Sequence, residues 1–223
     1  MFSCLLHKGT DEECDWVTIE GHAVCIKPSE SGRDPGERGG HAHGTRDVMI
    51  RPEGAHHRVV PIKDAAQWRE AVGRVYGVEG TALDSKVRTF GGFYDPRDNT
   101  LRINPVLDDP ASEMSVDYRR NALDPMGFGK DVTARQFVEW HETGHAVADA
   151  ESEERPGAYG EGSVFDAAKE DGFPFTSYGR GSETEGFADF YAFYRSDPGR
   201  ARGLYPTATA QVERILRGMK GRR

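Results

Sequence analysis

The residues of this chain with the clearest chemical potential lie in His141-Glu-Thr-Gly-His145, inside a stretch whose apolar spacing predicts a helix over residues 131–150. Residues four apart lie above one another on one helix face, so both imidazoles can reach the same metal ion. Glu142 projects about a hundred degrees round the helix, beside the metal but not aimed at it. There it can hold a water molecule and take its proton. The motif therefore predicts a hydrolytic zinc site with two histidine ligands and Glu142 as general base.

A catalytic zinc ion needs a third protein ligand and an open position. Glu151 stands six residues after His145, where the three-histidine class has its third histidine, and that class is disfavoured. The acidic residues of a second predicted helix, over residues 182–194, are the other candidates. They are Glu183, Glu185 and Asp189. Because Ser182 and Glu185 also fit a helix capping box, the residues alone leave Glu185 open between a structural cap and a metal ligand.

Three segments follow one another in a recognisable order. They are Glu139-Trp-His-Glu-Thr-Gly-His-Ala-Val-Ala-Asp149, Phe175-Thr-Ser-Tyr-Gly-Arg180 and Glu183-Thr-Glu-Gly-Phe-Ala-Asp189. Together they resemble the catalytic domain of anthrax lethal factor and its relatives, among them the clostridial proline-proline endopeptidases. The resemblance covers about residues 85–218, including a predicted hairpin ahead of the metal helix.

The resemblance implies a role for each matching residue. The implied zinc ligands are His141, His145 and Glu185. Glu142 is implied to be the general base, and Tyr178 the phenol that stabilises the reacting carbonyl oxygen. Asp189 is implied to orient a ligand histidine, although the family carries Glu at this position. From the residues alone, a buried aromatic is the favoured interpretation of Tyr178. The large substrate-recognition domains of lethal factor have no counterpart here, so its kinase substrates are not implied.

The predicted fold class is α+β: a zincin-like metallopeptidase domain with an active-site helix, a small sheet with an edge strand, and a C-terminal helical half. The periodicity predicts helices over residues 64–76, 131–150, 163–171, 182–194 and 206–219, and strands over residues 86–94 and 100–103. Residues 100–103 are expected to form the edge strand. An extended peptide substrate would add to it through main-chain hydrogen bonds.

Composition divides the chain into three parts. Residues 1–27 contain a predicted hairpin, Trp16–Ile26, that turns at Glu20-Gly21. Residues 28–58 begin with a glycine-rich stretch without large apolar side chains and are predicted to be a flexible linker. Residues 59–223 are predicted to form the peptidase domain.

Further residues of metal-binding type lie near the N-terminus. They are the linker histidines (His41, His43, His56 and His57) and a mixed group (Cys4, Cys14, Cys25, His7 and His22). Solvated side chains are favoured over metal binding for the linker histidines. The cysteine spacing differs from that of a zinc ribbon or finger, which disfavours a zinc knot.

Charge and hydropathy limit the class of partner. The 223 residues include 37 acidic and 29 basic ones, a formal net charge of -8, which argues against nucleic acid as the main partner. No apolar run is long enough for a membrane-spanning helix, so no membrane insertion is expected. The segment Met1–His7 lacks a basic leader and a long apolar run, so no secretory signal is predicted. The protein could be cytoplasmic, associated with a virion, or released by a specialised route, and the sequence leaves these three locations open.

The leading interpretation is a zinc endopeptidase of the HExxH-plus-Glu type, which cuts a protein or peptide bound in extended form. Regulatory cleavage inside a cell and toxin-like cleavage of a host protein are both open. The alternative is a phage virion-associated or structural component whose zincin-like domain is cargo, a maturation protease or catalytically inert. That alternative depends on a similarity of the hairpin and linker to pieces of phage head and portal proteins. In it, the N-terminal segment contacts a virion or host protein.

Overall fold

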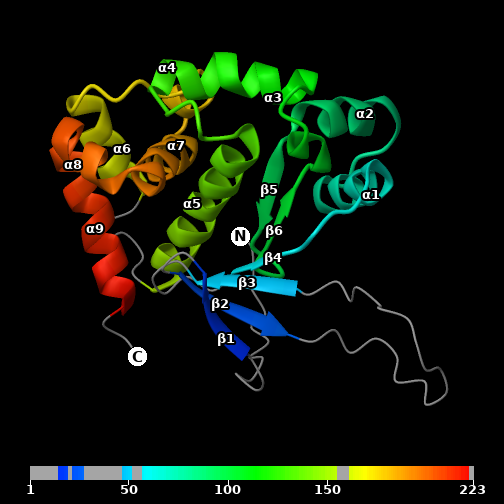
Figure 1. Cartoon of the computed structure of the whole chain (residues 1–223), viewed down its shortest axis with the longest axis horizontal. Helices are drawn as coiled ribbons and strands as arrows, with labels where there is room; N and C mark the ends of the chain where they lie inside the picture. Colours follow the sequence, from blue (N-terminus) through cyan, green and yellow to red (C-terminus); the bar gives the residue numbers. More distant parts are fainter. Residues whose placement is uncertain (1–14, 20–21, 28–46, 52–56, 155–160, 221–223) are drawn as a thin grey trace.

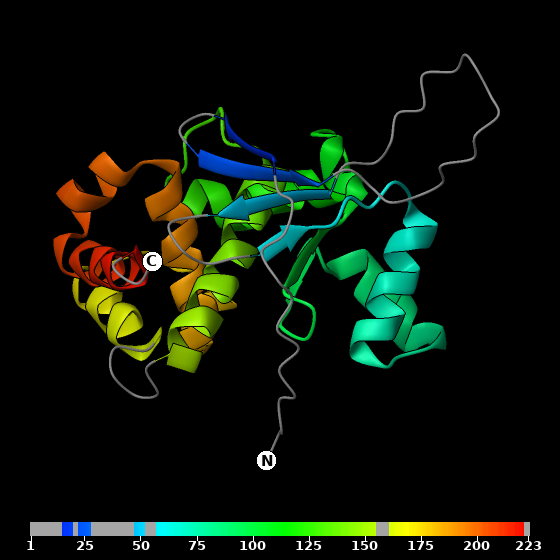
Figure 2. The ribbon, with the colours of Figure 1, turned by 90° about the horizontal axis from the view of Figure 1, so that it is seen from below.

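The computed structural model describes residues 15–19, 22–27, 47–51, 57–154 and 161–220. Over these residues the fold combines one mixed sheet with helices on both of its faces (Figure 1, Figure 2). The predicted α+β class is confirmed at this level.

The described strands form a sheet in the order β1-β2-β3-β4-β6-β5. They are β1 (Asp15–Ile19), β2 (His22–Lys27), β3 (Asp47–Arg51), β4 (His57–Val59), β5 (Gly92–Asp95) and β6 (Thr100–Ile103). Neighbouring strands are antiparallel except β4 and β6, which are parallel. Parallel pairing requires a long crossover, and the helices α1 and α2 provide it.

The predicted N-terminal hairpin is confirmed, with Val17 opposite Val24, although its turn lies outside the described residues. It does not stand alone, because β3 pairs with β2 on one side and with β4 on the other. Both β3 and β4 include residues of the range 28–58, so the linker prediction is wrong for these two segments. The apolar run Val48-Met49-Ile50 favours a strand, and the glycine-rich composition that suggested a linker belongs to residues outside the described part.

The helical elements follow in chain order. They are α1 (Ala65–Tyr76), α2 (Gly80–Thr89), η1 (Pro105–Asp108), α3 (Glu113–Tyr118), η2 (Arg119–Leu123), α4 (Asp124–Met126), α5 (Ala134–Glu154), α6 (Glu161–Glu170), η3 (Gly179–Gly181), α7 (Glu183–Ser196), α8 (Pro198–Leu204) and α9 (Pro206–Lys220). The five predicted helices correspond to α1, α5, α6, α7 and α9 with small differences at their ends.

One face of β5 and β6 packs on α1 and α2 through a small apolar cluster. Trp68 of α1 and Phe93 of β5 are buried there, with ring centroids 5.4 Å apart. Leu83 of α2 joins the same cluster, so α2 is held as a helix by its apolar side. The strand predicted over residues 86–94 is therefore wrong in its first half. Val87 and Thr89 favour a strand by residue type, but burial of the helix face of α2 decides the conformation.

The opposite face of this part of the sheet packs on α5, which lies in the middle of the molecule (Figure 1). Phe137, Val138 and Val147 of α5 are buried in the main core. On its other side α5 packs along α7, with α6, α8 and α9 beyond (Figure 2). Because α5 lies between the sheet and α7, residues of both can lie close to its two histidines.

The edge strand is β5 rather than residues 100–103. β6 pairs with both β4 and β5 and so lies inside the sheet, which contradicts the expectation for those residues. The carbonyl of Gly91 accepts a hydrogen bond from Asn104, toward β6, whereas the N–H of Tyr94 points away to Glu142. Since strand residues alternate in direction, the main-chain groups of Gly92 also point away from β6.

Some of the histidines and cysteines near the N-terminus lie within the described residues. His57 is buried in β4, so the expectation of a solvated side chain is wrong for this residue. His41, His43 and His56 lie outside the described residues, as do Cys4, Cys14 and His7. Cys25 and His22 belong to β2. No helix in the described part of the chain is both long enough and apolar enough to cross a membrane.

Candidate metal centre

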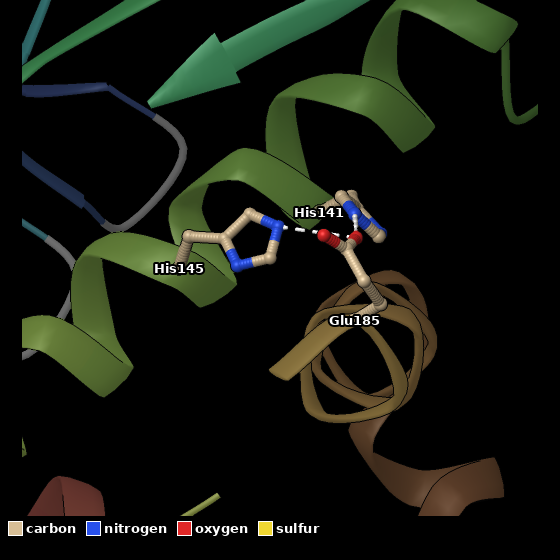
Figure 3. A group of neighbouring side chains, drawn as sticks. All are labelled: His141, His145 and Glu185. Atoms are coloured by element: carbon tan, nitrogen blue, oxygen red, sulfur yellow. Dashed lines mark hydrogen bonds and ion pairs between the residues drawn. The ribbon is translucent and has the colours of Figure 1, made fainter. Parts of the chain in front are cut away.

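Two histidines of α5 and one glutamate of α7 converge on a single point (Figure 3). Nε2 of His141 lies 3.1 Å from Oε2 of Glu185, and Nε2 of His145 lies 3.4 Å from the same oxygen. One donor atom from each of the three side chains falls within 4.8 Å of the other two. His141, His145 and Glu185 can therefore hold a metal ion.

The close packing of α5 on α7 brings the ligands together. A Cβ built on Gly144 would lie 2.9 Å from Cα of Ala188, so the absence of a side chain at Gly144 lets the two helices approach. The histidines flank Gly144 on α5, and Glu185 precedes Ala188 by almost one turn on α7. The ligand set is thus built at the contact between the two helices.

Glu185 lies at the start of α7, where the sequence left it open between a capping box and a metal ligand. Ser182 is the N-cap of α7 and accepts a hydrogen bond from the Glu185 N–H at 3.4 Å. The Glu185 carboxylate turns toward His141 and His145 (Figure 3). Capping therefore uses the Ser182 hydroxyl and the Glu185 amide, which leaves the Glu185 carboxylate for the metal site.

Asp189 supports the site from within α7. Its carboxylate is 1% exposed, and Oδ1 lies 3.1 Å from Nδ1 of His141. Oδ2 accepts hydrogen bonds from the main chain and hydroxyl of Thr176, at 3.0 and 2.7 Å. Aspartate is therefore long enough to reach the histidine, and it holds Nδ1 so that Nε2 faces Glu185.

The charges of the site shift the pKa values of two ligands in opposite directions. Burial alone would lower the pKa of His141, but hydrogen bonds to Asp189 and Glu185 outweigh it and raise the pKa to about 10. Burial would raise the pKa of Glu185, but hydrogen bonds from His141 and His145 hold it well below its usual range. Both shifts favour the charged forms of the pair, an imidazolium at His141 beside a carboxylate at Glu185.

Glu142 lies beside the ligands and is 8% exposed. Its Oε2 accepts a hydrogen bond of 2.9 Å from the N–H of Tyr94, on the edge strand β5. Among the described residues no other hydrogen bond to Glu142 is found, and its side chain lines a cavity at the metal centre. The carboxylate is thus held at one oxygen and open at the other.

A cavity of about 720 Å³ opens over these residues. It runs from the metal centre past β5 toward α3, and Phe137 and Val138 form part of its floor. Tyr178 stands at its mouth and is 71% exposed, so it is not a buried core aromatic. The negative charge of Glu185, partial burial and a hydrogen bond with Glu185 raise the pKa of the Tyr178 hydroxyl. Tyr178 therefore stays a neutral hydrogen-bond donor close to the metal centre.

Three further tyrosines line the cavity, and the sequence motifs imply a role for none of them. They are Tyr76, Tyr94 and Tyr118. Burial and the charge of Glu142 raise the pKa of Tyr118 to about 12. A Cβ on Gly91 would lie 2.6 Å from the Tyr118 hydroxyl, so this phenol packs directly against the start of β5. Tyr94 is two residues after Gly92, so strand alternation places both on the same face of β5. This spacing is the feature of the sequence that indicates where Tyr94 lies.

Comparison with known proteins returns no relative. No protein-family model matches the chain, and neither a curated protein nor a solved structure matches it. The chemistry of the site therefore carries the functional argument.

Proposed function

We propose that this chain is a zinc-dependent endopeptidase with a zincin-like catalytic domain. The observation that carries the proposal is the convergence of His141, His145 and Glu185 beside Glu142, in a cavity bordered by the edge strand β5. Two imidazole nitrogens and one carboxylate are a ligand set of catalytic zinc sites, which leaves a fourth position for water or substrate. The 3.1 Å contact between Nδ1 of His141 and Oδ1 of Asp189 is the kind of outer contact that such ligands usually make.

Each residue has a defined task in peptide hydrolysis. When bound, zinc supplies a Lewis acid that polarises the scissile carbonyl and acidifies water. Glu142 accepts the proton of the attacking water and passes it to the leaving amine. The Tyr178 hydroxyl donates a hydrogen bond to the carbonyl oxygen as negative charge develops on it. These roles are the ones that the resemblance to the lethal factor family implies.

The substrate binds as an extended peptide along β5. The outward N–H and C=O of Gly92 are free of the β6 ladder and line the cavity, so a peptide can pair with them as an added strand. Gly92 also brings the strand close to α5, since a Cβ there would lie 2.7 Å from Cγ1 of Val138. The scissile bond would then pass between β5 and the metal centre.

The test compares the parent chain with Glu142→Gln on a proteome-derived peptide library. Both proteins are loaded with zinc, their zinc content is measured, and new peptide termini are identified by mass spectrometry. We expect the parent to cleave peptides, and the variant to hold zinc but to cleave at background level. No cleavage by the zinc-loaded parent, or equal cleavage by both, would contradict the proposal and favour a catalytically inert domain.

A further inference from the structure

Tyr94 contacts α5 through both its main-chain N–H and its side-chain hydroxyl. Its N–H donates to Oε2 of Glu142 at 2.9 Å, and its hydroxyl lies 2.9 Å from Oδ2 of Asp149. Glu142 and Asp149 are seven residues apart, so they lie about two turns, roughly 10 Å, apart along one face of the helix. The Tyr94 side chain therefore runs alongside α5 from the general base to a second carboxylate.

The same phenol also meets the turn that joins β5 to β6. Oδ1 of Asn99 lies 3.1 Å from the Tyr94 hydroxyl. Asn99 has a φ of 52°, in the left-handed region, so this turn has a defined and uncommon backbone conformation. The hydroxyl of Tyr94 thus joins three elements, the edge strand, its turn and α5.

The main-chain bond at Glu142 depends on where β5 lies. The Tyr94 N–H is fixed to the strand, so a shift of β5 along or away from α5 would move the donor from the carboxylate. The packing of Gly92 on Val138 restrains one end of β5, and the Tyr94–Asp149 hydrogen bond restrains the other. A base that is misplaced by about 1 Å loses up to about a hundredfold in rate.

We propose that Tyr94, held by Asp149, is a positioning residue for the general base Glu142. The assignment rests on the proposed peptidase function. The hydroxyl of Tyr94 takes no part in proton transfer. It fixes the edge strand so that the Tyr94 amide occupies Oε2 of Glu142 and leaves the other oxygen directed to water and substrate.

The activity test uses Tyr94→Phe, Asp149→Ala, their double variant and Asp149→Asn in the full-length protein. We expect kcat to fall about tenfold to a hundredfold in Tyr94→Phe and in Asp149→Ala, with KM and zinc content little changed. The double variant should be no slower than Tyr94→Phe, because that variant already lacks the bond to Asp149. Asp149→Asn keeps an acceptor oxygen and should recover most of the rate. Tyr205→Phe makes the same chemical change away from the cavity and is the matched control.

A second measurement does not depend on activity. Amide hydrogen exchange at residue 94, followed by NMR in the metal-free protein, should be at least about tenfold faster in Tyr94→Phe and Asp149→Ala than in the parent. Unchanged exchange together with unchanged kcat would overturn the proposal, and so would losses of kcat that multiply in the double variant. If the parent cleaves no peptide, the peptidase proposal fails, and exchange alone decides whether Asp149 fixes the Tyr94 amide.

Discussion

Gly144 of α5 lies directly against Ala188 of α7, where a Cβ on the glycine would be 2.9 Å from Cα and 3.3 Å from Cβ of the alanine. His145 follows Gly144, and Asp189 follows Ala188. This close contact of the two helices is therefore next in sequence to a proposed ligand on α5 and to the residue that faces the other histidine on α7. The distance between the ligands depends on this contact.

Gly144→Ala should weaken metal binding. The new methyl group would meet backbone rather than a flexible side chain, so the helices must separate. Overpacking of this kind costs about 1–3 kcal/mol, against a gain of about 1 kcal/mol in helix propensity. We expect a lower melting temperature and weaker zinc affinity, measured by thermal unfolding and chelator competition. Gly203→Ala in α8 is the control, because nothing lies within 4 Å of its added Cβ. Zinc affinity equal to that of the parent would show that Gly144 does not set the spacing.

Glu185→Ala should abolish stoichiometric zinc binding. The variant removes the carboxylate that joins the two histidines, whereas the Ser182 cap bonds the main chain of residue 185 and can persist. Glu183→Ala is the matched control, since Glu183 is exposed in the same first turn of α7. Elemental analysis should find close to one zinc per chain in the parent and the control. Stoichiometric zinc in Glu185→Ala would limit Glu185 to a structural role.

The pairing of His141 and His145 on one helix face could be predicted because its signal is local. His141 and His145 are one turn apart on the same helix, and that spacing alone places their rings side by side, 5.0 Å between centroids. The third ligand comes from a different helix, and its direction depends on the α5–α7 contact at Gly144. Sequence spacing therefore left Glu185 open between a helix cap and a metal ligand. Only the packed structure shows that its amide contacts Ser182 while its carboxylate contacts the histidines.

The edge strand was misplaced for a similar reason. Residues 100–103 and 92–95 both have strand-like composition, and which of them lies at the edge depends on pairing with β4, over forty residues away in the chain. Pairing of that kind leaves no mark within the strand itself. The position of Tyr94 beside Glu142 and Asp149 follows from this pairing, so the predicted hairpin included Tyr94 but implied no role for it.

Asp189→Asn should weaken zinc binding without removing the ligands. The negative charge that faces Nδ1 of His141 is lost, and the new NH2 group must face either Nδ1 of His141 or the N–H of Thr176. Loss of such an outer contact typically lowers metal affinity about tenfold to a hundredfold. Chelator competition measures the affinity, and circular dichroism checks the fold. Affinity within twofold of the parent would show that His141 is oriented without Asp189.

The metal-free protein should show a pH dependence that the ligand pair determines. The pKa of His141 is raised from 6.5 to about 10, so its contribution to stability is complete below pH 6.5 and is lost as the pH rises toward 10. The pKa of Glu185 is lowered from 4.5, so its contribution is present above pH 4.5 and is lost as the pH falls further. The pair should therefore stabilise the metal-free chain most between pH 4.5 and pH 6.5, where both contributions are complete.

Zinc binding should consequently release the proton of His141 at neutral pH, because a histidine ligand must be neutral. Calorimetry in buffers of different ionisation enthalpy counts the protons released. We expect the count to fall by about one between pH 7.5 and a pH above the raised pKa of His141. Thermal unfolding of the chelated protein over the same range gives the stability. A constant proton count would contradict the imidazolium assigned to the metal-free site.

Tyr178→Phe should lower turnover while leaving the fold and the zinc content intact. Tyr178 is 71% exposed at the cavity mouth, so loss of its hydroxyl removes no core packing and should not change the melting temperature. The phenol lies close to Glu185 and keeps its proton, as a donor to developing negative charge requires. Loss of one such donor costs about 10²–10³ in kcat, roughly 3–4 kcal/mol. KM should change much less, since the donor acts mainly in the transition state.

The measurement is kcat and KM of Tyr178→Phe on a peptide that the parent cleaves, alongside melting temperature and zinc content. Tyr205→Phe, with the same loss of a hydroxyl in the packing around Phe173, is the control and should keep the parent's kcat. Turnover of Tyr178→Phe within threefold of the parent would remove Tyr178 from the mechanism. A rise in KM alone would instead make Tyr178 a substrate-binding group, because the interaction would then be as strong in the ground state as in the transition state.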